Sequence, residues 1–322
     1  MKAVVQDQYG SPDVLEFRDI EKPVAKDDEV LIRVHAASVN AADWHFLRGM
    51  PYIARLSLGL RKPKSKVRGR DVAGQVEMVG KDVKQFHAGD EVYAEVDSGS
   101  FAEYTCVTED LVGLKPSNLT FEQAAAVPLA ANTALQGLRD KGQIKPGQKV
   151  LIYGASGGVG TFAVQLAKAF GAEVTGVCST KKVDMVRSIG ADHVIDYTQE
   201  DFTQNVQRFD ILFDLVGNRS LSDYRRALTP KGTLVLSGGE GGRWLGSVKL
   251  LIKSLLLSPF VSQKLNAFLA KTKHEDLLVL KGLVEAGKVT PVIDKTYPLS
   301  EAPEAIRYLE GRHVQGKVVI TV

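Results

Sequence analysis

The segment from Lys149 to Cys178 limits the possible folds of this 322-residue chain more than any other part of the sequence. It begins with KVLIYG, an apolar run typical of a buried strand, and continues through a glycine-rich loop into VGTFAVQLAKAF, whose apolar residues recur at helical spacing. Gly171 ends this helix, and AEVTGVC then predicts a second strand. A strand, a helix and a strand within about 30 residues indicate a βαβ unit, in which the two strands are parallel.

The loop in this unit, YGASGGVG, matches two motifs with different chemistry. Gly154 to Gly158 fit G-x-S-x-G, the turn that presents a nucleophilic serine in many hydrolases. Ala155, Gly157 and Gly160 fit a dinucleotide-binding loop, with alanine in the place of the first glycine. Only the second motif explains Gly160, which would let the helix pack closely on the strand, and no HGGG-like oxyanion segment precedes the loop. The sequence therefore favours a dinucleotide loop over a hydrolase turn or an unoccupied turn.

The residues around the loop indicate which dinucleotide it binds. The N–H groups at the start of the helix would face the pyrophosphate, and the Ser156 hydroxyl would donate to a phosphate. The second strand ends GVCSTKK, without the Asp or Glu that accepts from the ribose 2′-OH in NAD-binding loops. Its hydroxyl and ammonium groups would stabilise a 2′-phosphate, which favours NADPH. The alternative is a solvated lysine pair, which the positive end of the helix dipole disfavours.

Strands and helices continue to alternate after this unit. HVIDY, FDILFDLVG and GTLVLSGG predict three more strands, and residues 262–270 predict a sixth. This alternation implies parallel βαβ units, so we expect an α/β fold with a doubly wound parallel sheet.

The two ends of the chain differ from this middle part. Thr120 and Gln123 form a capping-box pattern for one helix, and Pro128 marks a break before the next. Before them, short β-branched or alternating runs predict a mainly β domain with strands over 29–39, 72–80, 89–96 and 101–107. After the sixth strand, the pattern predicts helices over 274–287 and 301–310 and strands over 292–297 and 316–322.

The composition excludes several classes of protein. The chain is 44% hydrophobic and 25% charged with a net charge of +3, so neither nucleic acid nor a membrane is an expected partner. Its two cysteines provide neither a four-cysteine zinc site nor a disulfide framework, which suits the reducing cytoplasm. The N-terminus shows no signal-peptide pattern.

Two segments stand out from this average composition. The basic cluster at residues 55–70 is interpreted as a solvated loop, with a patch for an anionic ligand as the alternative. The apolar run at residues 244–260 carries Lys249 and Lys253 four apart, on one face of a helix. It predicts an amphipathic helix over a cleft or a subunit contact rather than a membrane anchor.

Segments spread over most of the chain together resemble a known family. They are VHAASVNAADWHFLRG (34–49), GRDVAGQVEMVG (69–80), GDEVYA (89–94), GSFAEYTCV (99–107), AAVPLAANTALQGL (125–138), VLIYGASGGVGTFAVQLAKAFGAEV (150–174), GADHVIDY (190–197) and GKVVI near the end. On these residues the chain resembles the medium-chain dehydrogenase/reductase superfamily, and most of all its zinc-independent quinone oxidoreductase branch. The resemblance implies a GroES-like β domain of residues 1–122 and 273–322, with a Rossmann dinucleotide-binding domain of residues 123–272 between them. It also implies an active site in the cleft and a homodimer.

The same resemblance provides a test of zinc dependence. Zinc-using relatives carry a catalytic cysteine where this chain has Asn40, and Gly-His-Glu where it has Gly69-Arg70-Asp71. Asn and Arg are poor zinc ligands, and Arg adds a positive charge. We therefore expect no catalytic zinc.

The resemblance also implies which residues bind the cofactor. The pyrophosphate would be held by Ala155, Ser156, Gly157, Gly158 and Val159. The adenosine 2′-phosphate would be surrounded by Ser179, Thr180, Lys182 and Tyr197. The nicotinamide would be bounded by Thr133, Val216, Gly217, Ser237, Gly238 and Gly239. Lys317 would reach the cofactor or the cleft.

Three residues are candidates for the substrate side, namely Asn40, Trp44 and Tyr52. Each has a structural alternative, since Asn40 would also suit the cap of a turn, Trp44 the core and Tyr52 the surface.

The activity that the resemblance implies is NADPH-dependent reduction of a quinone or an α,β-unsaturated ketone or aldehyde. A quinone needs little acid help, whereas an enone needs a proton at its α-carbon, from solvent or Tyr52. No His–Ser or carboxylate pair stands out, so no catalytic residue is assigned. The alternatives are an NADP-dependent alcohol or carbonyl oxidoreductase of the same superfamily, a non-catalytic NADPH-binding protein, and the hydrolase.

Overall fold

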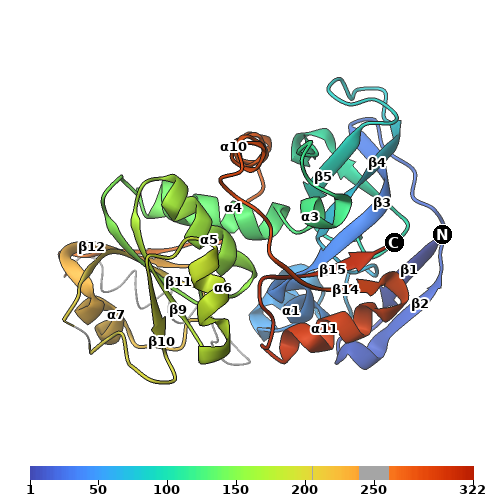
Figure 1. Cartoon of the computed structure of the whole chain (residues 1–322). Helices are drawn as coiled ribbons and strands as arrows, with labels where there is room; N and C mark the ends of the chain where they lie inside the picture. The colour runs from blue at the N-terminus through green and yellow to red at the C-terminus, as the bar shows by residue number, and fades with distance from the viewer. Residues whose placement is uncertain (205, 239–260) are drawn as a thin grey trace. The chain divides into compact units, whose positions relative to one another are not determined.

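The computed structural model of the chain describes residues 1–204, 206–238 and 261–322, which form two compact units (Figure 1). The first unit comprises Met1–Asn132, Thr272–Gly287 and Pro291–Val322, and the second comprises Thr133–Lys271 with Lys288–Thr290. The division falls after Asn132 and not at the predicted boundary between residues 122 and 123. Helix α3 (Phe121–Ala125) packs on the sheet of the first unit, and the division falls further along the chain, within the next helix.

Strands from both ends of the chain form the sheet of the first unit, which confirms the GroES-like arrangement. The strand order is β14-β15-β3-β4-β5-β7, and β6 pairs with β3 outside this path. The last strand of the chain pairs antiparallel with β3, so the two chain ends share one sheet. The strands are β3 (Glu29–Val39), β4 (Asp71–Val79), β5 (Glu91–Glu95), β6 (Tyr104–Thr108), β7 (Val112–Leu114), β14 (Ile293–Pro298) and β15 (Lys317–Thr321), with a separate pair β1 (Lys2–Gln6) and β2 (Leu15–Asp19).

The helices predicted near 120, after Pro128, over 274–287 and over 301–310 are confirmed. Helices α1 (Ala41–Arg48) and α2 (Arg55–Leu58) were not predicted, and α2 lies in the basic cluster interpreted as a loop. Thr120 and Gln123 form the predicted capping box of α3, in which the Thr120 N–H donates to Gln123 Oε1 at 3.0 Å. Pro128 begins α4 (Pro128–Gln136), which starts in the first unit and continues into the second at Thr133. Proline suits this first position because a backbone N–H there would have no partner within the helix. The other helices of this unit are α10 (His274–Glu285) and α11 (Ala302–Glu310).

The sheet of the second unit has the strand order β10-β9-β8-β11-β12-β13, and all its pairings are parallel. This confirms the doubly wound sheet, including the strand predicted over 262–270. The elements are β8 (Lys149–Tyr153), α5 (Gly158–Ala169), β9 (Glu173–Cys178), α6 (Val183–Ser188), β10 (His193–Asp196), β11 (Phe209–Asp214), α7 (Leu221–Ala227), β12 (Leu228–Leu236) and β13 (Lys264–Ala267).

The strand order places a switch point at the centre of this sheet. The chain moves from β8 outward to β10, then returns to β11 on the other side of β8 and moves outward to β13. Ligands of doubly wound sheets bind at the carboxyl ends of the strands beside such a reversal. The loops after β8 and β11 therefore lie where a dinucleotide is expected. None of the helices in the described ranges is long and apolar enough to span a bilayer.

Candidate functional site

The loop between β8 and α5 has the geometry of a phosphate-binding loop. Gly154 has a φ of 92°, which favours glycine, and the N–H groups of Gly154 and Ala155 both donate to the Val177 carbonyl oxygen. Gly157 caps α5, and within the described ranges no side-chain cap bond is made at this helix start, so the N–H groups of the first turn are available to an anion. A Cβ on Gly160 would lie 2.1 Å from the Gly154 carbonyl oxygen, so only glycine permits this close approach of helix and strand.

Ser156 lies within this loop and is 7% exposed. Among the described residues, no histidine or carboxylate forms a hydrogen bond with its hydroxyl. A serine nucleophile requires such a base. The geometry therefore favours the phosphate loop over the hydrolase turn.

The residues predicted to surround the 2′-phosphate come together at the ends of β9 and β10. Cys178 pairs with Asp196 in the parallel register, so Ser179 and Tyr197 leave the sheet side by side. Ser179 caps the short 3-10 turn Thr180–Lys182, and the backbone N–H of Lys182 donates to the Ser179 carbonyl oxygen at 2.9 Å. The Thr180 hydroxyl donates to the Asp196 carboxylate. The sequence analysis did not single out Asp196.

Asp214 organises the loop predicted to bound the nicotinamide. Its carboxylate accepts from the backbone N–H groups of Val216 at 2.9 Å and Gly217 at 3.0 Å, and from the Tyr224 hydroxyl at 2.7 Å. Burial raises the pKa of Asp214, and these three donors oppose that rise. The sequence analysis did not single out Asp214, although an acid at the end of a strand and three residues before a glycine is a signal for such a turn.

The loop after β12 lies beside this turn. The Ser237 N–H donates to the Asp214 carbonyl oxygen at 3.1 Å, and Gly238 has a φ of 109°. Of the remaining predicted residues, Gly239 and the predicted helix over 244–260 lie outside the described residues.

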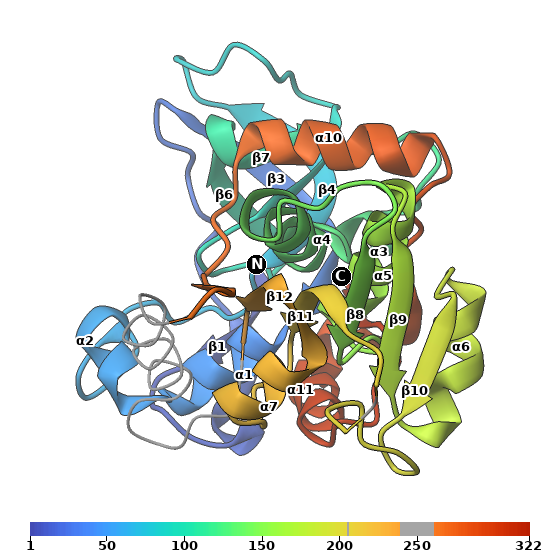
Figure 2. The ribbon, with the colours of Figure 1, turned by 90° about the vertical axis from the view of Figure 1, so that its left-hand side faces the viewer.

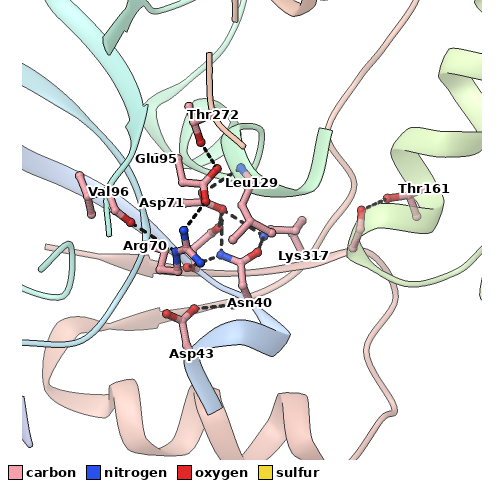
Figure 3. A network of polar contacts seen from close by, with 12 residues as sticks. Asn40, Asp43, Arg70, Asp71, Glu95, Val96, Leu129, Thr161, Thr272 and Lys317 are labelled. Carbon is pink, nitrogen blue, oxygen red and sulfur yellow. Dashed lines mark hydrogen bonds and ion pairs between the residues drawn. The ribbon is translucent and has the colours of Figure 1, made fainter. Parts of the chain in front are cut away.

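The first unit contains a buried polar cluster of Asn40, Asp71 and Lys317 (Figure 3). The Lys317 Nζ donates to Asn40 Oδ1 at 2.5 Å and to Asp71 Oδ2 at 3.3 Å, and Asn40 Nδ2 donates to Asp71 Oδ2 at 2.9 Å. The Ser38 hydroxyl and the Leu129 N–H also donate to Asp71. Asp71 is fully buried and Lys317 is 2% exposed, so the lysine is the counter-ion of a desolvated carboxylate.

The sheet register explains why these residues meet. Val318 pairs with Val39 and Ser38 pairs with Asp71, so the ends of β15, β3 and β4 lie in adjacent positions. Lys317 and Asn40 flank these pairs, although they are 277 positions apart in the sequence. Asn40 is also the N-cap residue of α1, which agrees with the structural alternative that the sequence analysis gave for it. It therefore has a capping role in addition to its place in this cluster.

A second ion pair lies next to the cluster. The Arg70 guanidinium donates to Glu95 Oε1 at 2.7 Å, and the Thr272 hydroxyl donates to the other oxygen of Glu95 (Figure 3). Burial raises the pKa of Glu95, and Arg70 opposes this rise. Below the cluster, Asp43 accepts from the Asn40 N–H at 2.7 Å, and burial raises its pKa to about 7.

The remaining predicted residues have local packing partners. Trp44 packs against the apolar core of the first unit and stacks on the ring of His45, which corresponds to its core alternative. Tyr52 is half-buried and lies 4.8 Å from the Arg55 guanidinium. Thr133 lies within α4 and is 7% exposed.

The positions compared with zinc ligands form ion pairs and hydrogen bonds within the chain instead. Arg70 is bonded to Glu95, and Asn40 and Asp71 are bonded to Lys317. In the described ranges, no group of three or more His, Cys, Asp or Glu side chains is arranged to hold a metal ion.

Comparisons with known proteins agree with this architecture. The alcohol dehydrogenase GroES-like domain family matches residues 26–117, and the zinc-binding dehydrogenase family matches residues 189–320. The chain is 37% identical to the chloroplastic NADPH-dependent alkenal/one oxidoreductase of Arabidopsis thaliana, over 99% of this chain and 79% of that protein.

Two solved structures are similar along the whole length. The quinone oxidoreductase from Coxiella burnetii is 33% identical, with a TM-score of 0.86 over 100% of this chain and 99% of that one. The Escherichia coli quinone oxidoreductase complexed with NADPH is 26% identical, with a TM-score of 0.84 over 100% of both chains. The fold, the site geometry and these relatives together show that the chain belongs to the medium-chain dehydrogenase/reductase superfamily, in its quinone oxidoreductase-like branch.

Proposed function

We propose that this chain is an NADPH-dependent, zinc-independent oxidoreductase that reduces quinones or α,β-unsaturated carbonyl compounds by hydride transfer. The observation that carries the proposal is the open N-terminus of α5 at the switch point, with Ser179, Thr180, Lys182 and Tyr197 gathered at the ends of the two adjoining strands. The relatives named above support the substrate class, since one is an alkenal/one oxidoreductase and two are quinone oxidoreductases.

The residues present fit the cofactor. The first turn of α5 would bind its pyrophosphate, and Lys182 its 2′-phosphate, while the Asp214-anchored turn at Val216 and Gly217 would bound its nicotinamide. When bound, NADPH supplies the hydride.

Lys317 is the residue we assign to the substrate oxygen. An ammonium group has three donors, and Asn40 and Asp71 accept from two of them. The third would donate to the carbonyl oxygen, on which negative charge develops during reduction. Asn40 has a different role, since its amide oxygen and nitrogen are both bonded within the cluster and hold the lysine in place.

The activity is tested by following NADPH oxidation with three panels of compounds, namely quinones, α,β-unsaturated aldehydes and ketones, and saturated ketones. We expect turnover with at least one of the first two panels. Turnover confined to saturated ketones, with NADP-dependent oxidation of the matching alcohols, would favour the alcohol oxidoreductase. Tight NADPH binding without turnover on any panel would favour a non-catalytic binding protein.

Lys182→Ala tests the choice of cofactor. Loss of one charge-assisted contact costs about 1.5–3 kcal/mol, so the affinity for NADPH is expected to fall by about 10- to 150-fold. The affinity for NADH is expected to stay the same, because NADH has no 2′-phosphate. Lys181→Ala is the matched control, since Lys181 is an exposed neighbour on the same turn. Fluorescence titration of both nucleotides measures these affinities, and an equal loss for both would contradict the assignment.

Two further features stay predictions. They are a homodimer and a location in the cytoplasm, both expected from the sequence.

A further inference from the structure

Residues 53–66 form a segment that exposes apolar and basic side chains together; we call it the 53–66 segment. The side chains of Ile53, Leu56 and Leu60 are 43%, 72% and 68% exposed, respectively. Single exposed apolar residues are common on protein surfaces, but three within eight residues form a cluster. Leu58 is half-buried and Pro63 is buried, so the segment has one side toward the protein and one toward solvent.

The basic side chains of this segment have few acidic neighbours. The chain has no Asp or Glu from residue 44 to residue 70. Arg61, Lys62 and Lys64 are exposed, and within the described ranges none of them forms an ion pair, whereas Lys66 pairs with Asp7 at 3.2 Å. Three positive charges are therefore available next to three exposed apolar side chains.

The shape of the segment is fixed by contacts at its base. The Arg55 Nε donates to the Gly49 carbonyl oxygen at 2.9 Å, and its guanidinium lies 4.5 Å from the Tyr9 ring. The Tyr9 hydroxyl donates to the Gly59 carbonyl oxygen at 2.7 Å, and the Lys64 N–H donates to the Leu58 carbonyl oxygen at 2.8 Å. These bonds fix the backbone on both sides of Leu56 and Leu60, whose side chains are exposed. Helix α2, within the segment, lies at the margin of the first unit, apart from β3 and β4 (Figure 2).

We propose that the 53–66 segment binds the surface of an anionic lipid bilayer. Leu56 and Leu60 would enter the headgroup region, where apolar side chains leave water, and Arg61, Lys62 and Lys64 would contact lipid phosphates. A nucleic acid would attract the same charges but would leave the leucines in water. The bilayer surface therefore accounts for both features. The sequence analysis expected no membrane partner, because it considered the net charge of the whole chain; this proposal rests instead on the local grouping of exposed side chains. It goes beyond the proposed function and does not depend on it.

Co-sedimentation of the full-length protein with vesicles tests the proposal. Vesicles of phosphatidylcholine are compared with vesicles that also contain phosphatidylglycerol, at low and at physiological salt. We expect binding that requires the anionic lipid and weakens with salt. Equal binding to both vesicles, or no binding to either, would overturn the proposal.

Two double variants separate the contributions of charge and apolar contact. Lys62→Glu with Lys64→Glu is expected to lower partitioning by about twentyfold or more, because each basic residue near an anionic surface contributes about fivefold. Leu56→Ser with Leu60→Ser is also expected to lower it while leaving the melting temperature unchanged, since both side chains are exposed. Lys145→Glu with Lys288→Glu is the matched control, because these lysines are exposed elsewhere on the chain.

An effect of the lysine variant alone, together with tighter binding to DNA than to vesicles, would identify a nucleic-acid surface instead. Loss of self-association in the leucine variant without loss of vesicle binding would identify a contact between copies and overturn the role of the leucines.

Discussion

Replacing Lys317 by methionine is expected to lower kcat with quinone or enone substrates by about 10²–10³, because it removes the charged donor that we assign to the substrate oxygen. The same change leaves the buried Asp71 carboxylate without its cation, which is expected to cost about 3–5 kcal/mol of unfolding free energy. Steady-state kinetics and chemical denaturation measure the two effects. Lys317→Arg keeps the charge and is expected to lose less of both.

A double variant distinguishes catalysis from charge balance. Lys317→Met with Asp71→Asn removes both charges of the pair, so much of the lost stability is expected to return. The low kcat is expected to persist, because no ammonium group is restored. Recovery of kcat together with stability would show that Lys317 is only a counter-ion, and would remove it from the proposed site without affecting the cofactor assignment.

Replacing Gly160 by alanine is expected to weaken NADPH binding by about 100-fold, which corresponds to about 2.7 kcal/mol. The added Cβ would lie 2.1 Å from the Gly154 carbonyl oxygen and 2.7 Å from the Ala155 carbonyl carbon. Both contacts are with backbone, so α5 must move away from the loop whose N–H groups bind the pyrophosphate. Overpacking of this kind also costs about 1–3 kcal/mol of unfolding free energy. Fluorescence titration with NADPH and thermal unfolding measure both effects.

Gly282→Ala is the control for this substitution. Gly282 lies inside α10, and a Cβ placed there would meet no heavy atom within 4 Å. Alanine is favoured over glycine in a helix by about 1 kcal/mol, so this variant is expected to be slightly more stable and to bind NADPH normally. Wild-type affinity and stability in Gly160→Ala would show that the loop tolerates a side chain, and the assignment of the pyrophosphate site to it would be wrong.

Much of the second unit was predictable because its signals are local. Each buried strand is a short apolar run, and α5 shows apolar residues at helical spacing, so the six strands, this helix and the glycine-rich loop were found in the sequence. The capping box at Thr120 and Gln123 was also local, since it depends on residues three apart. The order of the strands, which places the switch point beside β8, depends on pairings between distant segments and is known from the structure.

The polar cluster could not be predicted in the same way. Lys317 was a candidate, but its partners Asn40 and Asp71 lie 277 and 246 positions away. The residues next to Lys317 in the sequence do not indicate that Asp71 is the carboxylate with which it forms an ion pair. The domain boundary is a similar case, because α3 is assigned to the first unit by its packing on the sheet and not by its own sequence pattern.

By itself, the sequence determined the alternation of strands and helices, the glycines that a phosphate loop needs and the hydroxyl and lysine residues that favour NADPH, because these depend on spacing and residue type. Only the tertiary structure decided that Lys317 pairs with Asp71 and Asn40, that Asp214 anchors the turn at Val216 and Gly217, and that Leu56 and Leu60 face solvent. The physical reason is that register and burial are properties of segments that meet in space, whereas spacing is a property of one segment alone.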